Sequence, residues 1–344
     1  GTLNMMPVES PGAFMNECSG GGESSGDELP PLFESDDDVE PIPVPSPAHL
    51  HRCSAWSVVE SPTRVDGTRE RWLVQKNNTS LDQTRVRMVQ HEGEWHFVRD
   101  RLSSLNSQVG VLGLALSLTT PDQPSRAPVV VILGGGGMAM PMCVVHAHET
   151  AEVVVVEQDP IAIDLARRFF GAVHARLRVV EGDAFDFVLS GRSTDVAVLI
   201  IDIDFMNGEP PSVFVSAIFW DRLFAAVREA GVVVVNTIGA SPERVDSLAK
   251  LALSSQTHHD GLVAGCFEPA HDSERGDRWT SFVPRPSTLV FGREVLLELF
   301  RGAGSVDWTL KLDTGLEQLL RLTSPLREGL ASNRGLAGRW RKIP

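Results

Sequence analysis

The chain has 344 residues, a formal net charge of −14 at pH 7 and 42% hydrophobic residues, which is enough for a sizeable buried core in one or two domains. The first 50 residues contain ten acids and no Lys or Arg, so the remainder holds 35 acids against 31 bases. The body is therefore only mildly acidic, and we expect no nucleic acid among its partners.

Residues 1–48 combine those acids with eight of the 22 prolines. This composition predicts a disordered acidic tail that ends in an extended, polyproline-like spacer. The alternative is a partner-binding arm in which Asp36, Asp37 and Asp38 mimic phosphate groups.

Four scattered cysteines show no metal-type spacing, and no secretory signal opens the sequence. Both features predict a reducing, cytoplasmic setting. Residues 127–145 are uncharged and reach membrane-spanning length, but four consecutive glycines, Pro128 and Pro141 argue against a spanning helix. The histidine spacings favour no metal site, so we expect neither a membrane nor a metal.

The predicted elements begin with a small antiparallel β region over residues 49–106, including a hairpin of 84–90 with 95–98. A short apolar helix over 107–118 leads into the next domain. From there apolar strands alternate with helices: strands at 129–133, 152–157, 177–181, 195–201 and 232–236, and helices at 138–148, 160–170, 184–189 and 213–230, the last closed by Gly231.

Near-continuous apolar strands separated by helices are typical of a parallel sheet covered on both faces. The sequence therefore predicts an α/β fold, a doubly wound, Rossmann-like domain over 107–300. A helix at 242–255 and strands near 262–267 and 287–291 would add an antiparallel edge. The rest, 301–344, is predicted as a C-terminal helical extension ending in the basic tip Arg339, Arg341 and Lys342.

The most informative residues are Gly134, Gly135 and Gly136, which follow the first apolar strand. Glycines let the backbone turn sharply and approach a ligand closely. Glu157 follows Gly136 by 21 residues, close to the spacing of about 20 at which an acid accepts hydrogen bonds from ribose hydroxyls. This pattern favours a nucleoside-cofactor site over a purely structural turn.

The later strands also end in polar residues. Asp183 could accept from an adenine amine, and Asp202 could face the ligand cleft. Asp204 is either substrate-facing or turn-stabilising, and Asn236 is better explained as a turn residue. No Lys-Ser or Lys-Thr pair follows the glycines, which argues against a nucleoside triphosphate. S-adenosylmethionine needs no such lysine.

Four motifs in order carry a family resemblance: Leu-Gly-Gly-Gly from 133, Val-Glu-Gln-Asp-Pro from 156, Glu-Gly-Asp-Ala-Phe from 181 and Ile-Asp-Ile-Asp from 201. Over about residues 84–292 the chain resembles the spermidine-synthase-like branch of class I methyltransferases. Within it, the likeness is greatest to the C-terminal domain of enzymes that methylate the N-terminus of translation elongation factor 1 alpha. The resemblance implies cofactor contacts from Gly134, Gly135, Gly136, Glu157, Asp183 and Asp202. We also expect Ala184 to contact the cofactor and Asp202 and Asp204 to be catalytic.

The chain departs from the aminopropyl-transferring members of this family. They carry an acid directly after the three glycines, where this chain has Gly137, and a Ser-rich segment where it has Ile203 and Phe205. We therefore expect an S-adenosylmethionine-dependent methyltransferase acting on an amine of a protein, such as an elongation factor. The alternatives are a polyamine aminopropyltransferase and an inactive scaffold that binds through its acidic tail. The oligomeric state is left open, a dimer included.

Overall fold

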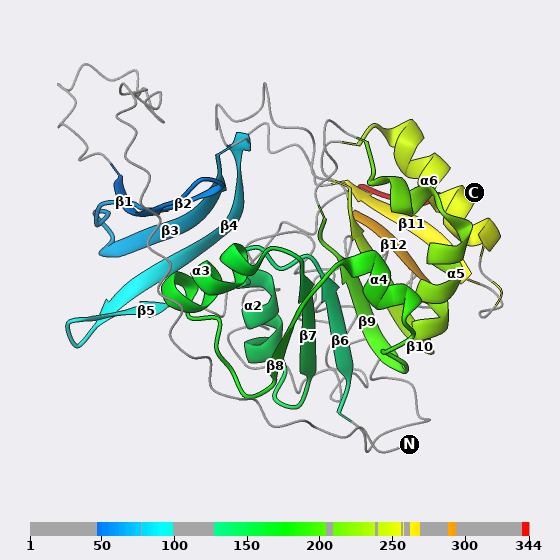
Figure 1. Ribbon diagram of the computed structural model, residues 1–344, viewed down its shortest axis with the longest axis horizontal. Helices are drawn as coiled ribbons and strands as arrows, with labels where there is room; N and C mark the ends of the chain where they lie inside the picture. Colours follow the sequence, from blue (N-terminus) through cyan, green and yellow to red (C-terminus); the bar gives the residue numbers. More distant parts are fainter. Residues whose placement is uncertain are drawn as a thin grey trace.

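The computed structural model describes residues 47–76, 78–98, 127–203, 209–237, 240–255, 257, 262–268, 288–293 and 339–343. Two sheets organise these residues (Figure 1). The first is antiparallel and runs in chain order through β1 (Ala48–Arg52), β2 (Trp56–Glu60), β3 (Thr68–Gln75), β4 (Asn78–His91) and β5 (Glu94–Phe97). The expected small β region is present, and the β4–β5 hairpin turns at Glu92 and Gly93, both with positive φ.

The second sheet has eight strands in the order β13-β11-β12-β10-β9-β6-β7-β8. The strands β8, β7, β6, β9 and β10 are parallel, and β12, β11 and β13 continue the sheet antiparallel. The fold class is thus confirmed, antiparallel edge included. The strand bounds are β6 (Val129–Leu133), β7 (Glu152–Glu157), β8 (Leu177–Glu181), β9 (Val196–Ile201), β10 (Val227–Asn236), β11 (Leu262–Glu268), β12 (Thr288–Arg293) and β13 (Arg339–Ile343).

Helices cover both faces of this sheet, because side chains alternate between its faces and both sets are apolar. On one face, Val130, Ile132, Val153 and Val155 pack against α2 (Ala139–Ala147) and α3 (Pro160–Phe170). On the other, an aromatic-rich core gathers the 3-10 helix η2 (Ser212–Val215) and the helices α4 (Ala184–Leu189), α5 (Ala217–Ala226) and α6 (Pro242–Ser255). None of the helices in the described ranges is both long and apolar enough to cross a membrane.

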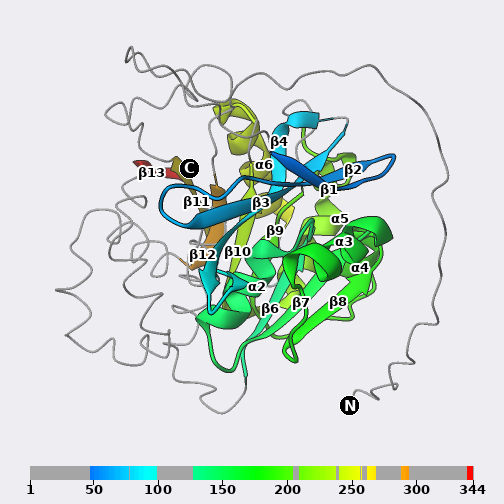
Figure 2. The same cartoon turned by 90° about the vertical axis from the view of Figure 1, so that its left-hand side faces the viewer.

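Helix α3 is shared between the two sheets, as its place beside β2 and β3 shows (Figures 1 and 2). Ile163 and Ala166 face the main sheet. Ala162, Leu165 and Phe170 instead join the inner face of the small sheet, where they meet Trp56, Val58, Leu73 and Val86. The small sheet is therefore attached to the main domain largely through this one helix.

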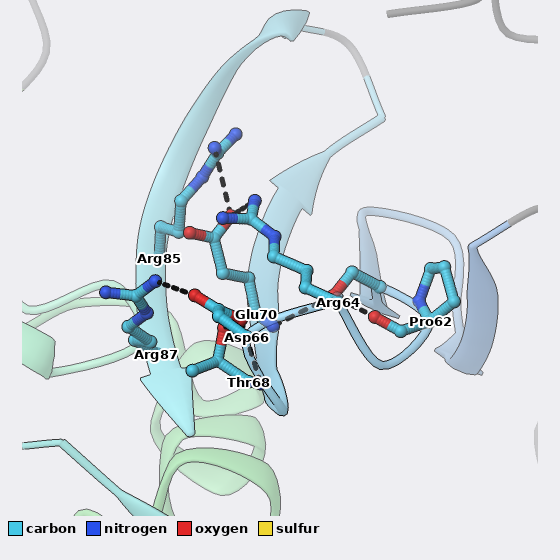
Figure 3. Close-up of polar contacts among 8 residues, drawn as sticks. Pro62, Arg64, Asp66, Thr68, Glu70, Arg85 and Arg87 are labelled. Atoms are coloured by element: carbon cyan, nitrogen blue, oxygen red, sulfur yellow. Dashed lines mark hydrogen bonds and ion pairs between the residues drawn. The ribbon is translucent and has the colours of Figure 1, made fainter. Parts of the chain in front are cut away.

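The opposite face of the small sheet carries ion pairs rather than an apolar core (Figure 3). Glu70 accepts from Arg64 at 2.7 Å and from Arg85 at 3.5 Å, and Asp66 accepts from Arg87 at 2.8 Å. The Thr68 hydroxyl and N–H, which both donate to Asp66, hold the pKa of that carboxyl below its usual value. Exposed pairs contribute little stability each, so the apolar inner face holds this sheet in place.

Two expectations about secondary structure are wrong, one for the helix over 213–230 and one for the basic tip. The helix expected over 213–230 ends at Ala226, and β10 begins at once with Val227, a buried residue that pairs with Val196 of β9. Gly231 lies inside that strand rather than capping a helix. A Cβ there would come within 2.4 Å of the Val227 side chain.

The second concerns the chain's end. The basic tip was expected in a helix, but residues 339–343 form β13, which pairs with β11 and buries Ile343 in the aromatic-rich core. The expected helix at 107–118 and the remainder of the expected C-terminal extension lie outside the described residues.

Candidate functional site

The candidate site is the rim formed by the carboxyl ends of five neighbouring parallel strands. The chain runs from β6 to β7 and β8 on one side, then returns to β9 and β10 on the other. The sheet thus has its topological switch point between β6 and β9, where ligands bind in open α/β sheets. The glycines follow β6, Glu157 ends β7, Asp183 follows β8, Asp202 follows β9 and Asn236 ends β10.

The glycine loop is fixed at its base by backbone bonds on both sides. The Gly134 N–H donates to the Val156 carbonyl at 2.9 Å, and the Asp202 N–H donates to the Leu133 carbonyl at 2.8 Å. Gly134 has a φ of +92°, and a Cβ there would lie 2.3 Å from the Asp202 carbonyl oxygen. Only glycine fits where the two strand ends approach so closely.

Glu157 lies half-buried beneath the glycine loop and binds its backbone directly. Its Oε2 accepts from the N–H groups of Gly135 and Gly136 at 2.8 and 3.0 Å, and its Oε1 accepts from the Asp159 N–H at 2.9 Å. A carboxylate offers about four acceptor positions. Three are therefore filled, which leaves capacity for one ribose hydroxyl rather than the pair that an acid at this spacing is expected to hold.

Asp183 and Ala184 begin α4 on the neighbouring strand end. Asp183 is exposed, and its Oδ1 accepts from the Phe185 and Asp186 N–H groups at 2.7 and 3.1 Å, so this oxygen caps the helix. The Gly182 N–H donates to the Glu157 carbonyl at 3.0 Å, which holds this turn beside the end of β7. Half-buried Ala184 packs on the aromatic-rich core.

Asp202 has a side-chain partner that the sequence did not suggest. The Asn236 amide, buried at the end of β10, donates to Asp202 Oδ1 at 2.8 Å. Asn236 is therefore part of the rim and orients the acid, whereas it was expected to be a turn residue. Asp204 lies outside the described residues, so its role remains a prediction.

Two further residues reach this site from the small sheet. The Thr84 hydroxyl of β4 accepts from the Gly137 N–H at 2.8 Å, and the Trp56 indole N–H of β2 donates to Asp159 Oδ2 at 2.7 Å. Both contacts join residues more than 50 positions apart, and no local pattern in the sequence indicates them. In the described ranges no cluster of three His, Cys, Asp or Glu side chains is placed to hold a metal.

Comparison with known proteins agrees with this arrangement. Residues 117–252 match the family described as the spermine/spermidine synthase domain. The protein named eEF1A lysine and N-terminal methyltransferase from Danio rerio is 29% identical over 153 residues, 41% of this chain and 22% of that protein. Its namesake from Mus musculus is 26% identical over 148 residues, 40% of this chain and 21% of that protein. The chain thus spans about a fifth of the length of these relatives.

Among solved structures, a probable spermidine synthase from Corynebacterium glutamicum superposes with a TM-score of 0.53 and 14% identity. The match covers 83% of this chain and 88% of that chain, so the likeness of fold extends well beyond residues 117–252. Residues 117–252 therefore carry a spermidine-synthase-like domain, and the fold of the chain resembles that of the probable spermidine synthase.

Proposed function

We propose that this chain is an S-adenosylmethionine-dependent methyltransferase that modifies an amine, an N-terminus or a lysine, of a protein. The curated relatives are named for such a reaction on eEF1A, which makes a translation elongation factor the first substrate to test. The observation that carries the proposal is the rim itself. Close-packed glycine backbone, the Glu157 carboxylate and the Asp202–Asn236 pair occupy adjacent strand ends at the switch point.

The residues of the rim fit an adenosyl cofactor. Glu157 has one acceptor position for a ribose hydroxyl, and Asp183 keeps a second oxygen for the base, because the helix cap uses only Oδ1. Bound S-adenosylmethionine would supply an activated methyl group. The protein's part is then to align an unprotonated amine with it. Asp202, oriented by Asn236, is the acid suited to holding that amine or balancing the cofactor's positive charge.

One contact favours methyl transfer over aminopropyl transfer. A Cβ built on Gly137 would lie 2.7 Å from the Thr84 Cγ2, so the space beside position 137 is filled by β4. The family resemblance implies that aminopropyl-transferring members hold a diamine with an acid at this position. No acid can be placed there without moving Thr84, and a dication without matched carboxylates binds poorly.

The test is product mass spectrometry. The chain is incubated either with S-adenosylmethionine and purified eEF1A, or with decarboxylated S-adenosylmethionine and putrescine. We expect a methyl group on an amine of eEF1A and no methylthioadenosine from putrescine. Asp202→Asn should lower turnover by about 100-fold or more. Asp164→Asn, which removes an exposed carboxylate from α3, is the matched control and should leave turnover unchanged.

The other outcomes separate the alternatives. Methylthioadenosine formed only with putrescine would replace the proposal with aminopropyl transfer. The absence of both products, together with no binding of S-adenosylhomocysteine in calorimetry, would identify an inactive scaffold.

A further inference from the structure

The small sheet does more than cover α3, because two of its side chains bond to the loops that form the cofactor site. We propose that Trp56 and Thr84 are positioning residues, which set the orientation of Glu157 and of the glycine loop before any cofactor arrives. This inference rests on the proposed function for its consequence in binding, but its geometric part stands on hydrogen bonds between described residues.

The first connection runs from Trp56 to Glu157 through Asp159. The Trp56 indole is 7% exposed, and its N–H donates to Asp159 Oδ2, while Asp159 Oδ1 accepts from the Ile161 N–H at 2.8 Å as the cap of α3. Both oxygens of Asp159 are thus held. Its backbone N–H then donates to Glu157 Oε1. The indole therefore fixes the residue whose backbone orients the Glu157 carboxylate, and Glu157 Oε2 in turn fixes Gly135 and Gly136.

The second connection runs from Thr84 to the other side of the loop. Its hydroxyl accepts from the buried Gly137 N–H, and its Cγ2 and Cβ would lie 2.7 and 2.8 Å from a Cβ at position 137. A buried N–H without an acceptor is costly, so the loop is strongly favoured in the conformation that meets Thr84. The loop residues 135, 136 and 137 thus have all three N–H groups directed at fixed acceptors, Glu157 and Thr84.

Pre-organisation of this kind lowers the ordering cost of binding. Hydrogen bonds already hold the Glu157 carboxylate and the loop together, so a ligand does not have to order them. Removing the Trp56 or Thr84 bond should therefore weaken cofactor binding.

Three variants test the first connection. Trp56→Phe keeps an aromatic ring and removes the N–H. Val58→Ala is the matched control, because Val58 is fully buried in the same cluster on the same face of β2 but makes no bond to Asp159. We expect Trp56→Phe to weaken S-adenosylhomocysteine binding by about tenfold, and Val58→Ala to lower Tm comparably without that loss. In a Glu157→Gln background, Trp56→Phe should add almost nothing, because both changes act on one carboxylate.

For the second connection, Thr84→Val keeps the branched shape and removes the hydroxyl, whereas Thr84→Ser keeps the hydroxyl. We expect the valine variant to lose affinity and the serine variant to retain it.

Amide hydrogen exchange, followed by NMR without ligand, separates this proposal from the proposed function. Trp56→Phe should accelerate exchange at Gly135 and Gly136, Thr84→Val should accelerate it at Gly137, and Val58→Ala should do neither. If the wild type fails to bind S-adenosylhomocysteine, the proposed function fails while the exchange result still decides the positioning. Unchanged exchange at all three glycines would overturn the positioning proposal. So would equal losses of affinity in Trp56→Phe and Val58→Ala, together with a Trp56→Phe loss that adds fully to that of Glu157→Gln.

Discussion

Replacing Glu157 by glutamine tests the centre of the site with the least change of shape. The carboxylate accepts three backbone N–H groups and keeps one position for a ribose hydroxyl. A glutamine side chain has one oxygen and one NH₂ group, so one end must turn a donor toward an N–H of the loop or of Asp159. At least one charge-assisted bond is lost in the protein, and the bond to the ribose loses its charge.

Hydrogen bonds to charged groups contribute about 1.5–3 kcal/mol each, and about 1.4 kcal/mol corresponds to tenfold in affinity. We therefore expect Glu157→Gln to bind S-adenosylhomocysteine about 10- to 100-fold more weakly in calorimetry. It should also lower the free energy of unfolding by about 1–3 kcal/mol, seen as a fall in Tm of about 2–4 °C for each kcal/mol.

Glu152→Gln is the matched control, because Glu152 is an exposed glutamate at the opposite end of the same strand, β7. Glu152→Gln should change neither the affinity for S-adenosylhomocysteine nor the free energy of unfolding. Unchanged affinity in a folded Glu157→Gln variant would refute the ribose assignment, and an unchanged Tm would show that the three backbone bonds contribute little to stability.

Three further predictions concern the loop, a titrating histidine and the tail. Gly134→Ala should destabilise the protein by about 3 kcal/mol or more in urea unfolding, because its Cβ would meet the Asp202 carbonyl oxygen at 2.3 Å. Gly191→Ala, with a φ of +62° and open space, should cost only about 1 kcal/mol, and similar losses in both would contradict the close approach. Burial and the neighbouring Arg176 hold the pKa of His174 below its usual value, so the folded state takes up a proton less readily than the unfolded chain. Tm should therefore fall as the pH drops from about 7 toward 5, less steeply in His174→Gln; identical slopes would refute this. Deleting residues 1–46, which stops short of β1, should leave Tm and affinity for S-adenosylhomocysteine unchanged; unfolding of the shortened chain would show that the acidic segment packs on the body.

The sequence predicted the parallel core well because its signals are local. α3 begins and ends as expected, since Pro160 is its first residue, Asp159 caps its start and Gly171, at a φ of 59°, ends it. Glu157, Asp183 and Asp202 also lie at or just after strand ends as expected, because the mainly apolar strands indicate where they stop. The hydrogen bonds of Glu157 to the loop amides could not be inferred from the sequence, because a spacing of about 20 residues does not say how many acceptor positions the backbone uses.

What the sequence could not indicate are contacts between distant elements. Thr84 and Trp56 meet residues 53 and 103 positions away, and neither residue type is distinctive of such a role. Asn236 resembles any polar residue after a strand, and its role appears only when β10 lies beside β9. The end of α5 was misplaced because Ala226 and its neighbours suit a helix, whereas the pairing of Val227 with Val196 favours a strand.

Helix α3 contributes one set of side chains to the core of the main sheet and another to the core of the small sheet. Unfolding of either core therefore exposes apolar surface of the other. We therefore expect the two sheets to unfold as a single cooperative unit, although by architecture they look like separate modules. The small sheet would not persist as an autonomous module, since its inner face would lose Leu165 and Phe170, both almost wholly buried. Local loosening in the β-rich half is thereby transmitted to the Rossmann-like half as a change in global stability.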